Sequence, residues 1–426
     1  MKIAMIGGGS TYTPELMEGL IKYHEQLNLK ELFLLDIKES EQKFNIVADL
    51  CERMVVKAGN PFVVKRGYDP VEAIEGSDFV VQQWRAGLLQ GRVKDEKIPL
   101  KYGIIGQETT GIGGFTCALR GFPIVEKYVD LVKKHTDNAY IINFANPSGL
   151  ISEFAINYLN YDKFIGLCNV PINMVNHVAE KFNVSRDDVF LRYYGLNHLS
   201  WVDQLLVNGK DMTKESMEDL FRPENIPNMD SYDKLSKVTE MSMNAYLRYY
   251  YTTPQMLSKE MEELDGKGTR GEQVQKIENE LLKLYSDTTL DEKPSQLSER
   301  GGSMYSTAAV ELIKDLYTGT KRLHIVNVRN EGAVSNLPDD YVLEVNAMTS
   351  KNKAFTVGIG EIPKLSMGLI HTIKSFERLT AEAYLEKSRE KAMQAMLIHP
   401  LGPRGEDVEK LFNELIEANS DYIKVF

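Results

Sequence analysis

Three consecutive glycines near the start of the chain constrain its fold more than any other feature. They follow a short apolar run, Lys2–Ile6, which predicts a buried strand, and they precede Pro14, a residue typical of the first turn of a helix. A tight turn between a strand and a helix brings backbone N–H groups and the helix N-terminus close to a ligand, which suits a pyrophosphate. The usual dinucleotide-binding fingerprint has a third glycine where this chain has Tyr12.

An aspartate further along the chain supports a dinucleotide site at this turn. Asp36 directly follows the second predicted strand, Leu32–Leu35, where a carboxylate accepts hydrogen bonds from a ribose diol and repels a 2′-phosphate. We therefore expect NAD in preference to NADP, the alternative being a structural turn and a solvated aspartate. The residues expected to bind the cofactor are Gly7, Gly9, Ser10, Thr11 and Asp36.

The first 170 residues alternate short apolar runs with amphipathic stretches. The predicted strands are Lys2–Ile6, Leu32–Leu35, Phe62–Val64, Phe79–Val81, Ala139–Phe144 and Phe164–Leu167. The predicted helices between them include Pro14–Lys22, Lys43–Val56 and Pro123–Lys134. This alternation predicts an α/β fold with a doubly wound parallel sheet of the Rossmann type.

The pattern changes after about residue 188. Two stretches, Val189–Tyr194 and Leu199–Val207, predict an antiparallel ribbon with a turn at Asn208-Gly209. Helices are predicted at Arg270–Tyr285, Tyr305–Leu316 and Ala381–Ala395, and strands at Leu323–Val328 and Tyr341–Val345. We expect residues 1–170 to form an NAD-binding domain and residues 171–426 a C-terminal α+β domain for catalysis, substrate binding and oligomerisation, with a cleft between them.

The composition excludes several classes of protein. The 426 residues include 61 acidic and 50 basic side chains, and a net charge of −11 does not suit a nucleic-acid-binding protein. The 3 cysteines are widely spaced, which argues against a disulfide framework and favours a reducing compartment. No apolar stretch reaches the length of a membrane span. We expect a cytoplasmic protein with neither nucleic acid nor membrane as a partner.

Polar side chains follow two later predicted strands, at the sheet edge where open α/β proteins bind ligands. Asn146 follows Ala139–Phe144 and precedes a proline, which favours an extended backbone there. Cys168 follows Phe164–Leu167. Taken alone, Cys168 is typical of a small buried side chain and His198 of a core histidine, and their separation of 30 residues does not define a metal site.

Tyrosines and arginines provide further candidates. The stretch 244–251 contains four tyrosines, most of which would form the aromatic face of a core helix. One of them could act as a general base if nearby positive charge lowered its pKa. The guanidinium group suits phosphate binding, although surface and salt-bridge roles are the ordinary alternative. The arginines in question are Arg92, Arg120, Arg270 and Arg300.

Seven motifs occur in order along most of the chain. They are GGGSTYTPEL at 7–16, RVKDEKIPLKYGIIGQETTGIGG at 92–114, NFANPSGL at 143–150, GLCNVP at 166–171, GLNHLSW at 195–201, NAYLRYYY at 244–251 and TRGEQV at 269–274. Together they resemble glycoside hydrolase family four, and in particular its 6-phospho-β-glucosidase branch. The resemblance implies a lactate-dehydrogenase-like architecture, NAD and Mn²⁺ as cofactors, a phosphorylated disaccharide or aryl glycoside as substrate, and a homodimer or homotetramer.

The same resemblance implies roles for individual residues. Cys168 and His198 match the Mn²⁺ ligands of the family. Tyr246 matches the catalytic base, and Glu108 the residue that makes this tyrosine more basic. The residues implied in substrate binding are Arg92, Asn146, Asn169 and Arg270. In the α-glucoside branch an acidic Asp stands in place of Asn169. Because an amide cannot donate a proton in that way, the difference fits the β-branch and leaves the leaving-group acid unidentified.

The family chemistry differs from that of glycosidases with two catalytic carboxylates. As the resemblance implies, NAD⁺ oxidises C3 of the sugar, Tyr246 removes the C2 proton while Mn²⁺ stabilises the negative charge, and the aglycone leaves by elimination. Water then adds and the hydride returns to C3, so there is no net redox change.

Three alternatives remain open from the sequence. A 2-hydroxy acid dehydrogenase with a similar fold would need a His–Asp proton relay, for which no convincing motif is present, and would release NADH. A regulatory module that senses NAD would need neither Cys168 nor Tyr246. A family member acting on another glycoside would share most of the motifs.

Overall fold

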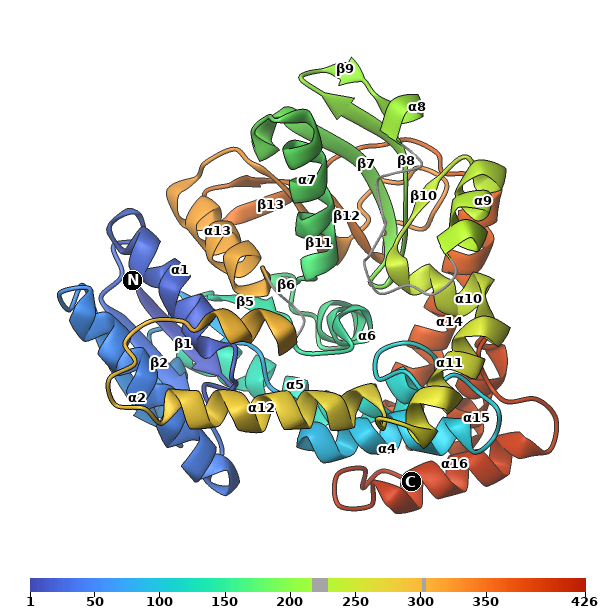
Figure 1. The fold of residues 1–426 in the computed structure, drawn as a ribbon, viewed down its shortest axis with the longest axis horizontal. Helices are drawn as coiled ribbons and strands as arrows, with labels where there is room; N and C mark the ends of the chain where they lie inside the picture. Colours follow the sequence, from blue (N-terminus) through green and yellow to red (C-terminus); the bar gives the residue numbers. More distant parts are fainter. Residues whose placement is uncertain (217–228, 301–303) are drawn as a thin grey trace.

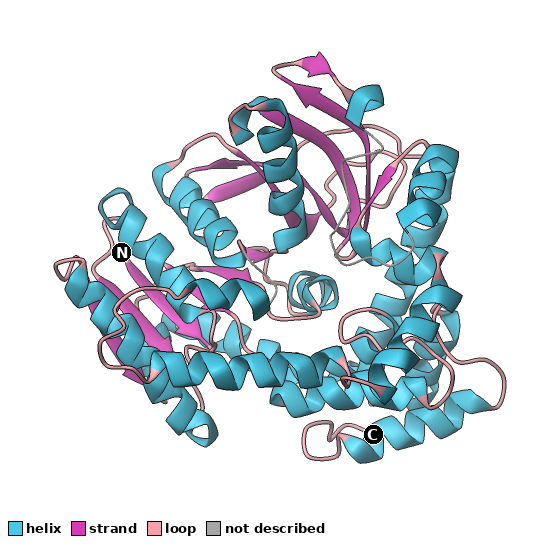
Figure 2. Ribbon diagram, in the orientation of Figure 1, coloured by secondary structure: helices cyan, strands magenta, loops and turns pink. Residues whose placement is uncertain are grey.

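A nine-stranded sheet forms the centre of the protein in the computed structural model, which describes residues 1–216, 229–300 and 304–426 (Figures 1 and 2). The strand order is β13-β12-β11-β6-β5-β4-β1-β2-β3, and the last six strands in this order pair in parallel. The parallel strands are β1 (Lys2–Ile6), β2 (Glu31–Leu35), β3 (Val63–Gly67), β4 (Phe79–Gln82), β5 (Tyr140–Asn143) and β6 (Phe164–Gly166). The prediction of a doubly wound sheet is confirmed, and its strand order reverses between β1 and β4.

Both faces of the parallel sheet are covered. Ile3 and Met5 of β1 belong to one apolar core, and Ala4 and Ile6 belong to the other, because successive side chains of a strand point to opposite faces. The helices in the first half are α1 (Thr13–Leu27), α2 (Glu41–Lys57), α3 (Pro70–Ile74), α4 (Leu88–Leu100), α5 (Gly111–His135), α6 (Ser148–Glu153) and α7 (Asn169–Phe182). The fully apolar runs of the central strands are explained by this burial on both faces.

The second half adds strands to the large sheet and forms a smaller one. The predicted ribbon is an antiparallel pair, β7 (Val189–Leu196) and β8 (Leu199–Val207). The short strands β9 (Lys210–Asp211) and β10 (Ser242–Met243) both pair with β8 and complete the smaller sheet. Strands β11 (Leu323–Arg329), β12 (Val342–Ser350) and β13 (Lys353–Thr356) extend the large sheet, with β11 antiparallel to β6. The sheet therefore contains strands from both sides of residue 170, and the division into domains 1–170 and 171–426 stays a prediction.

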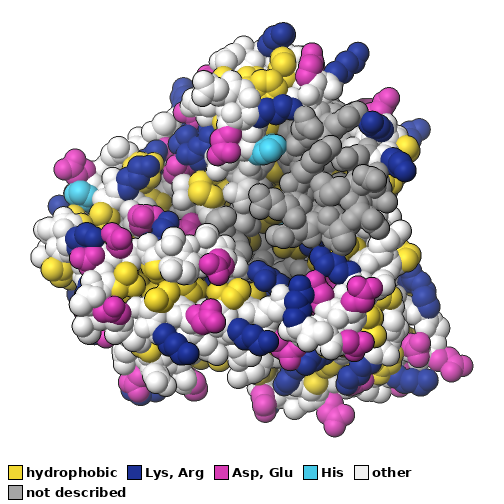
Figure 3. Space-filling view, viewed as in Figure 1, with side chains coloured by type: hydrophobic (Ala, Val, Ile, Leu, Met, Phe, Trp, Pro, Cys, Tyr) yellow, Lys and Arg dark blue, Asp and Glu magenta, His cyan; other side chains and the backbone are white. Residues whose placement is uncertain are grey.

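The remaining helices surround these sheets. They are α8 (Thr213–Ser216), α9 (Met229–Thr239), α10 (Arg248–Tyr251), α11 (Thr253–Asp265), α12 (Arg270–Tyr285), α13 (Tyr305–Thr318), α14 (Lys364–Glu386), α15 (Arg389–Ile398) and α16 (Asp407–Ala418). Helix α12 has the predicted bounds and lies across α2 and α4 (Figure 1). Acidic and basic side chains are interspersed on the face shown in Figure 3. Within the described ranges, no helix has the length and apolar character needed to cross a membrane.

Two predicted helices differ from the structure. The single helix expected at Ala381–Ala395 is wrong, because α14 ends where Lys387 takes a left-handed φ of 54° and the Ser388 side chain caps the start of α15. Apolar periodicity continues across this break and does not reveal it. The helix predicted at Pro123–Lys134 is the second half of α5, whose first turns contain the glycines of residues 111–114 and are held by burial in the core.

Lys374 on α14 connects three elements through a buried charge cluster. It is 1% exposed, and its Nζ lies 2.9 Å from Glu153 Oε2 on α6 and 2.5 Å from Glu377 Oε2. The same Nζ donates to the carbonyl of Val342 on β12 at 2.7 Å. These contacts fix α14 against the large sheet.

We predict that Lys374→Met destabilises the protein by about 3–5 kcal/mol, because two buried carboxylates lose their shared cation. Lys101→Met is the matched control, since this lysine is 61% exposed in its ion pair with Glu414 and should cost less than about 1 kcal/mol. Thermal and denaturant unfolding midpoints measure both changes. Equal effects of the two substitutions would contradict this account of the cluster.

Candidate active site

The loop after β1 approaches the neighbouring strands so closely that side chains are excluded. The N–H groups of Gly7 and Gly8 both donate to the carbonyl of Leu35 at 2.9 Å. Gly7 has a φ of 86°, and a Cβ there would lie 2.9 Å from the backbone nitrogen of Trp84. The first glycine therefore satisfies both a backbone conformation and a packing constraint.

Asp36 lies beside this loop at the end of β2. The Gly9 N–H donates to its Oδ2 at 2.6 Å, and the Ile37 N–H donates to its Oδ1 at 2.8 Å. Burial raises the pKa of Asp36 above its ordinary value, although the two N–H groups and Lys43 oppose the shift. Asp36 thus both holds the glycine loop and borders the cavity in front of it.

A cavity of about 580 Å³ opens at the carboxyl ends of the strands, which is within the usual size of a cofactor site. Its lining includes Gly7, Gly9, Ser10, Asp36, Trp84, Tyr128, Phe144, Asn146 and Tyr305. Thr11 is not among the lining residues. It is fully buried beneath the loop, and its carbonyl accepts a hydrogen bond from Tyr285. Asn146 Oδ1 is buried without a hydrogen-bond partner among the described residues, so this amide can still bind a ligand.

The cavity has a basic side that sequence analysis did not fully identify. Arg300 lies over the ring of Tyr12 at 4.5 Å and pairs with Glu278 at 3.2 Å. Lys43 pairs with the same carboxylate at 2.6 Å. Arg270, at the start of α12, is exposed and donates to the carbonyl of Arg300 at 3.3 Å.

Cys168 lies at the N-terminus of α7. The Val170 N–H donates to its sulfur, as expected where a helix N-terminus stabilises a thiolate. The sulfur also lies 3.9 Å from Asn169 Oδ1 and 3.8 Å from the hydroxyl of Tyr305. Burial, followed by the nearby charge of Glu344, nevertheless raises the pKa of Cys168 to about 12. A bound cation would be needed to hold the sulfur as a thiolate at neutral pH.

His198 occupies the turn between β7 and β8 with a left-handed φ of 64°, a conformation that is uncommon for a histidine and typical of functional sites. Its Nδ1 lies 2.9 Å from Thr109 Oγ1. Its Nε2 is buried and has no hydrogen-bond partner in the part of the chain that the structure describes. Burial lowers the pKa of His198 to about 3, so the imidazole is neutral. A neutral imidazole with one nitrogen engaged and the other unpaired fits a metal ligand.

Tyr246 stacks on His198. Their ring centroids are 3.6 Å apart and the planes differ by 2°. Asn244 Oδ1 accepts a hydrogen bond from the Tyr246 N–H at 3.0 Å and fixes the backbone. Burial raises the pKa of Tyr246, with Cys168 acting in the same direction and Arg248 opposing it. The structure therefore brings Cys168, His198 and Tyr246 together, and a cation held by the first two would favour the ionised phenol.

Glu108 lies between two arginines. It makes an ion pair with Arg85 and another with Arg92, in which Oε1 and Nη1 are 3.1 Å apart. Burial alone would raise the pKa of Glu108, but Arg85 and Arg92 outweigh it and hold this pKa below its usual value. Glu108 is thus negatively charged, and its charge is one of the smaller causes that raise the pKa of Tyr246.

Glu96 connects Arg92 to the start of α12, where Arg270 is located. Glu96 Oε1 accepts from Arg92 Nε at 2.7 Å, and its Oε2 accepts from the Gly271 N–H at 2.7 Å. Arg92 is therefore committed to two carboxylates, whereas the guanidinium of Arg270 faces solvent. The contacts of Arg85 with Glu108 and of Thr109 with His198 could not be predicted from the sequence, because neither residue lies in a spacing pattern with its partner.

The described residues contain no group of three or more His, Cys, Asp or Glu that could hold a metal ion. Cys168 and His198 would therefore leave most of a coordination shell to a bound ligand.

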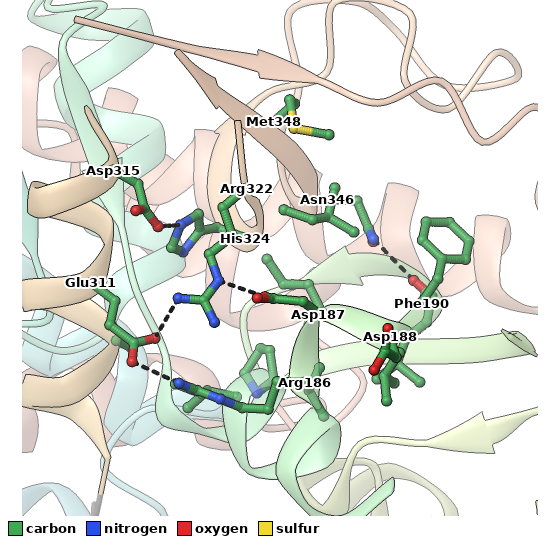
Figure 4. Close-up of a pocket in the computed structure, with 18 of the residues that line it drawn as sticks. Arg186, Asp187, Asp188, Phe190, Glu311, Asp315, Arg322, His324, Asn346 and Met348 are labelled. Atoms are coloured by element: carbon green, nitrogen blue, oxygen red, sulfur yellow. Dashed lines mark hydrogen bonds and ion pairs between the residues drawn. The ribbon is translucent and has the colours of Figure 1, made fainter. Parts of the chain in front are cut away.

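A second cavity, of about 890 Å³, lies between α7, α13 and the start of β11 (Figure 4). Its charged side chains pair with one another: Arg186 lies 2.6 Å from Glu311, Arg322 lies 2.8 Å from Asp187, and His324 lies 2.9 Å from Asp315 (Figure 4). Cys168 lines this cavity, whereas the glycine loop, Asp36 and Asn146 line the smaller one, and His198 and Tyr246 line neither. Tyr305, which lines the smaller cavity, lies 3.8 Å from the Cys168 sulfur. The candidate active site is therefore the smaller cavity together with the neighbouring cluster of Cys168, His198 and Tyr246.

The sheet has the architecture of nucleotide-binding enzymes, and beside it lie a cysteine and a histidine whose chemistry would suit a metal ion. The family model for family 4 glycosyl hydrolases matches residues 2–184, and the model for the C-terminal domain of this family matches residues 193–402. This chain belongs to glycosyl hydrolase family 4, as the motifs predicted.

Among the relatives, two 6-phospho-beta-glucosidases share more residues with this chain than a 6-phospho-alpha-glucosidase does. The chain is 47% identical to the 6-phospho-beta-glucosidase BglT of Thermotoga maritima over 100% of both chains, and 40% identical to a probable 6-phospho-beta-glucosidase of Bacillus subtilis over 100% of this chain and 98% of the relative. Identity to a 6-phospho-alpha-glucosidase of Lacticaseibacillus paracasei is 29%, over 99% of this chain and 97% of that one.

Solved structures agree with this grouping. The Thermotoga maritima 6-phospho-beta glucosidase with manganese, NAD⁺ and glucose-6-phosphate superposes with a TM-score of 0.93 at 47% identity over 99% of both chains. The lactate dehydrogenase of Trichomonas vaginalis has a TM-score of 0.57 at 13% identity, covering 91% of this chain and 99% of that one, which confirms the lactate-dehydrogenase-like fold and nothing more.

We predict that Gly7→Ala is more destabilising than Gly59→Ala. Both residues have a φ of 86°, but a Cβ at Gly59 meets no atom within 4 Å. Gly59→Ala should lower the free energy of unfolding by about 1 kcal/mol, because of its left-handed backbone alone. At Gly7 the contact with Trp84 should add a further loss of about 1–3 kcal/mol. Denaturant unfolding of both variants measures the difference, and equal losses would show that the loop does not pack as described.

Proposed function

We propose that this protein hydrolyses 6-phospho-β-glucosides, such as phosphorylated cellobiose-type disaccharides and aryl glycosides. The full-length similarity to a 6-phospho-beta-glucosidase carries the proposal. The enzyme is a glycosidase that uses NAD and Mn²⁺, and the glycine loop with Asp36 would hold NAD while Cys168 and His198 would hold Mn²⁺. When bound, NAD would supply a hydride acceptor and donor for C3 of the sugar, and Mn²⁺ would supply a Lewis acid that stabilises negative charge on the sugar.

In this proposal Tyr246 is the base. It removes the C2 proton, which allows the aglycone to leave from C1 by elimination before water adds. Its stacking on His198 places the phenol next to the metal ligand, where positive charge would lower its pKa, while the charge of Glu108 keeps the phenolate basic. A base of this kind accelerates a reaction by about 10²–10⁴-fold.

In this proposal an arginine binds the sugar phosphate and amides bind the sugar hydroxyls. Arg270 is the stronger candidate for the 6-phosphate, because its guanidinium is exposed and not committed to a carboxylate in the described structure. Arg92 positions Glu108 and borders the same region. Asn146 and Asn169 offer amides for sugar hydroxyls, and neither can serve as a leaving-group acid. The homodimer or homotetramer stays a prediction, which sedimentation of the purified protein tests.

The central test combines three readouts in one incubation. The protein is mixed with NAD⁺, Mn²⁺, a thiol reductant and a chromogenic 6-phospho-β-glucoside in D₂O. We expect release of the aglycone, deuterium at C2 of the product and no accumulation of NADH, because the hydride returns to C3. The same glycoside without its phosphate is the matched control. Stoichiometric NADH would favour a dehydrogenase, and the absence of aglycone release would contradict the proposal.

We predict that Tyr246→Phe lowers kcat by at least about 100-fold and abolishes exchange at C2, since the ring still stacks on His198 but has no proton acceptor. Binding of NAD⁺ and Mn²⁺ should be retained. Tyr249→Phe is the comparison variant, because the hydroxyl of this second buried tyrosine accepts a hydrogen bond from Arg248 at 3.2 Å. If Tyr246→Phe retains C2 exchange and Tyr249→Phe loses it, the base is Tyr249.

A further inference from the structure

Glu344 on β12 is a fully buried carboxylate held by neutral donors. Its Oε1 accepts hydrogen bonds from Asn197 Nδ2 at 3.0 Å and from Asn327 Nδ2 at 3.3 Å, and its Oε2 accepts from the hydroxyl of Tyr193 at 2.5 Å. Within the described residues Glu344 makes no ion pair. The three donors occupy both oxygens, which is the arrangement expected around a carboxylate.

Two other buried glutamates, Glu311 and Glu153, differ in that respect. Glu311 pairs with Arg186 and Arg322, and Glu153 pairs with Lys374 and Arg378. A buried charge without a counter-charge is costly, and neutral donors recover only part of its lost hydration. Burial raises the pKa of Glu344 to about 7, and within the described residues no ion pair opposes this shift, so a cation bound nearby would favour its charged form.

The candidate metal ligands lie next to this carboxylate. Asn197, which Glu344 binds, immediately precedes His198, and the same amide hydrogen-bonds to Cys168. The charge of Glu344 also acts on Cys168 strongly enough to rank directly after burial among the causes of its raised pKa. A dication between Cys168 and His198 would thus lie close to Glu344.

A second path of hydrogen bonds leads from Glu344 to the proposed base. The Tyr193 hydroxyl lies 2.5 Å from Ser200 Oγ, which accepts from Asn244 Nδ2 at 3.0 Å. Asn244 Oδ1 in turn binds the N–H of Tyr246 at 3.0 Å. Glu344 therefore contacts, through short chains of hydrogen bonds, both the turn that carries His198 and the segment that carries Tyr246.

We propose that Glu344 is a positioning residue for the metal site: it fixes the turn that presents His198 and supplies a buried negative charge that a bound dication requires. The inference rests on the proposed function only in taking Mn²⁺ as the ion. Partners of this kind, which bind a metal ligand rather than the metal, typically contribute 10–100-fold in metal affinity.

Mn²⁺ binding to the full-length protein tests the proposal. The paramagnetic resonance signal of free Mn²⁺ is followed during titration of the protein with saturating NAD⁺ and glucose 6-phosphate and a thiol reductant. We expect Glu344→Gln to weaken Mn²⁺ binding by about 10–100-fold while far-UV circular dichroism and NAD⁺ binding match those of the wild type. Glu311→Gln is the matched control, since it makes the same chemical change in a buried glutamate whose partners are Arg186 and Arg322, and it should leave Mn²⁺ affinity unchanged.

An unchanged Mn²⁺ affinity in folded Glu344→Gln overturns the proposal, as does an equal loss in Glu311→Gln. If Glu344→Gln does not fold, Asn197→Ala is the second variant, because it removes the link between Glu344 and the His198 turn but leaves the carboxylate in place. A weaker Mn²⁺ affinity of this variant supports the proposal, and wild-type affinity overturns it. Failure of the wild-type protein to bind Mn²⁺ would instead contradict the proposed function, and with it the role of Glu344.

Discussion

The close approach of the Gly7 turn to β2 and β4 is the contact on which the rest of the site depends. Two N–H groups share the carbonyl of Leu35, and the backbone of Trp84 lies where a side chain at Gly7 would be. This packing places the N-terminus of α1 and the carboxylate of Asp36 at the reversal of strand order, where parallel sheets bind nucleotides. The ends of β5 and β6 open onto the same edge and carry Asn146 and Cys168.

Burial is the second force that shapes this site, because it acts on each titratable group in the direction that neutralises it. It makes the imidazole of His198 neutral and disfavours the ionised forms of Cys168 and Tyr246. Glu108 stays charged despite its burial, because Arg85 and Arg92 accompany it. The protein thus provides a neutral imidazole, a thiol and a phenol whose charge states depend on what binds beside them. In the proposed function, this dependence would couple metal binding to proton abstraction.

Local patterns predicted several elements in both halves of the chain well. The strand at Lys2–Ile6 and the helix at Arg270–Tyr285 have their expected bounds, since an apolar run before glycines and a capping box at Thr269 are signals within a few residues. Periodicity did not reveal the break at Lys387, because one left-handed residue between two amphipathic helices leaves the apolar spacing unchanged. It also could not show that β11 joins β6, since strand pairing is decided by packing between distant segments.

Short motifs and their order along the chain were enough to predict the glycine loop, the succession of strands and helices, and the family. The sequence also named Cys168, His198 and Tyr246, but only through resemblance to a family. The stacking of His198 on Tyr246, and the hydrogen bond to Glu344 from Asn197, the residue before His198, arise only in the tertiary structure. Within the sequence of its strand, nothing distinguishes Glu344 from an ordinary polar residue. Glu344 is buried because β12 packs against β7 and β11. Contacts of this kind join segments far apart in the chain, so no local pattern of residues can encode them.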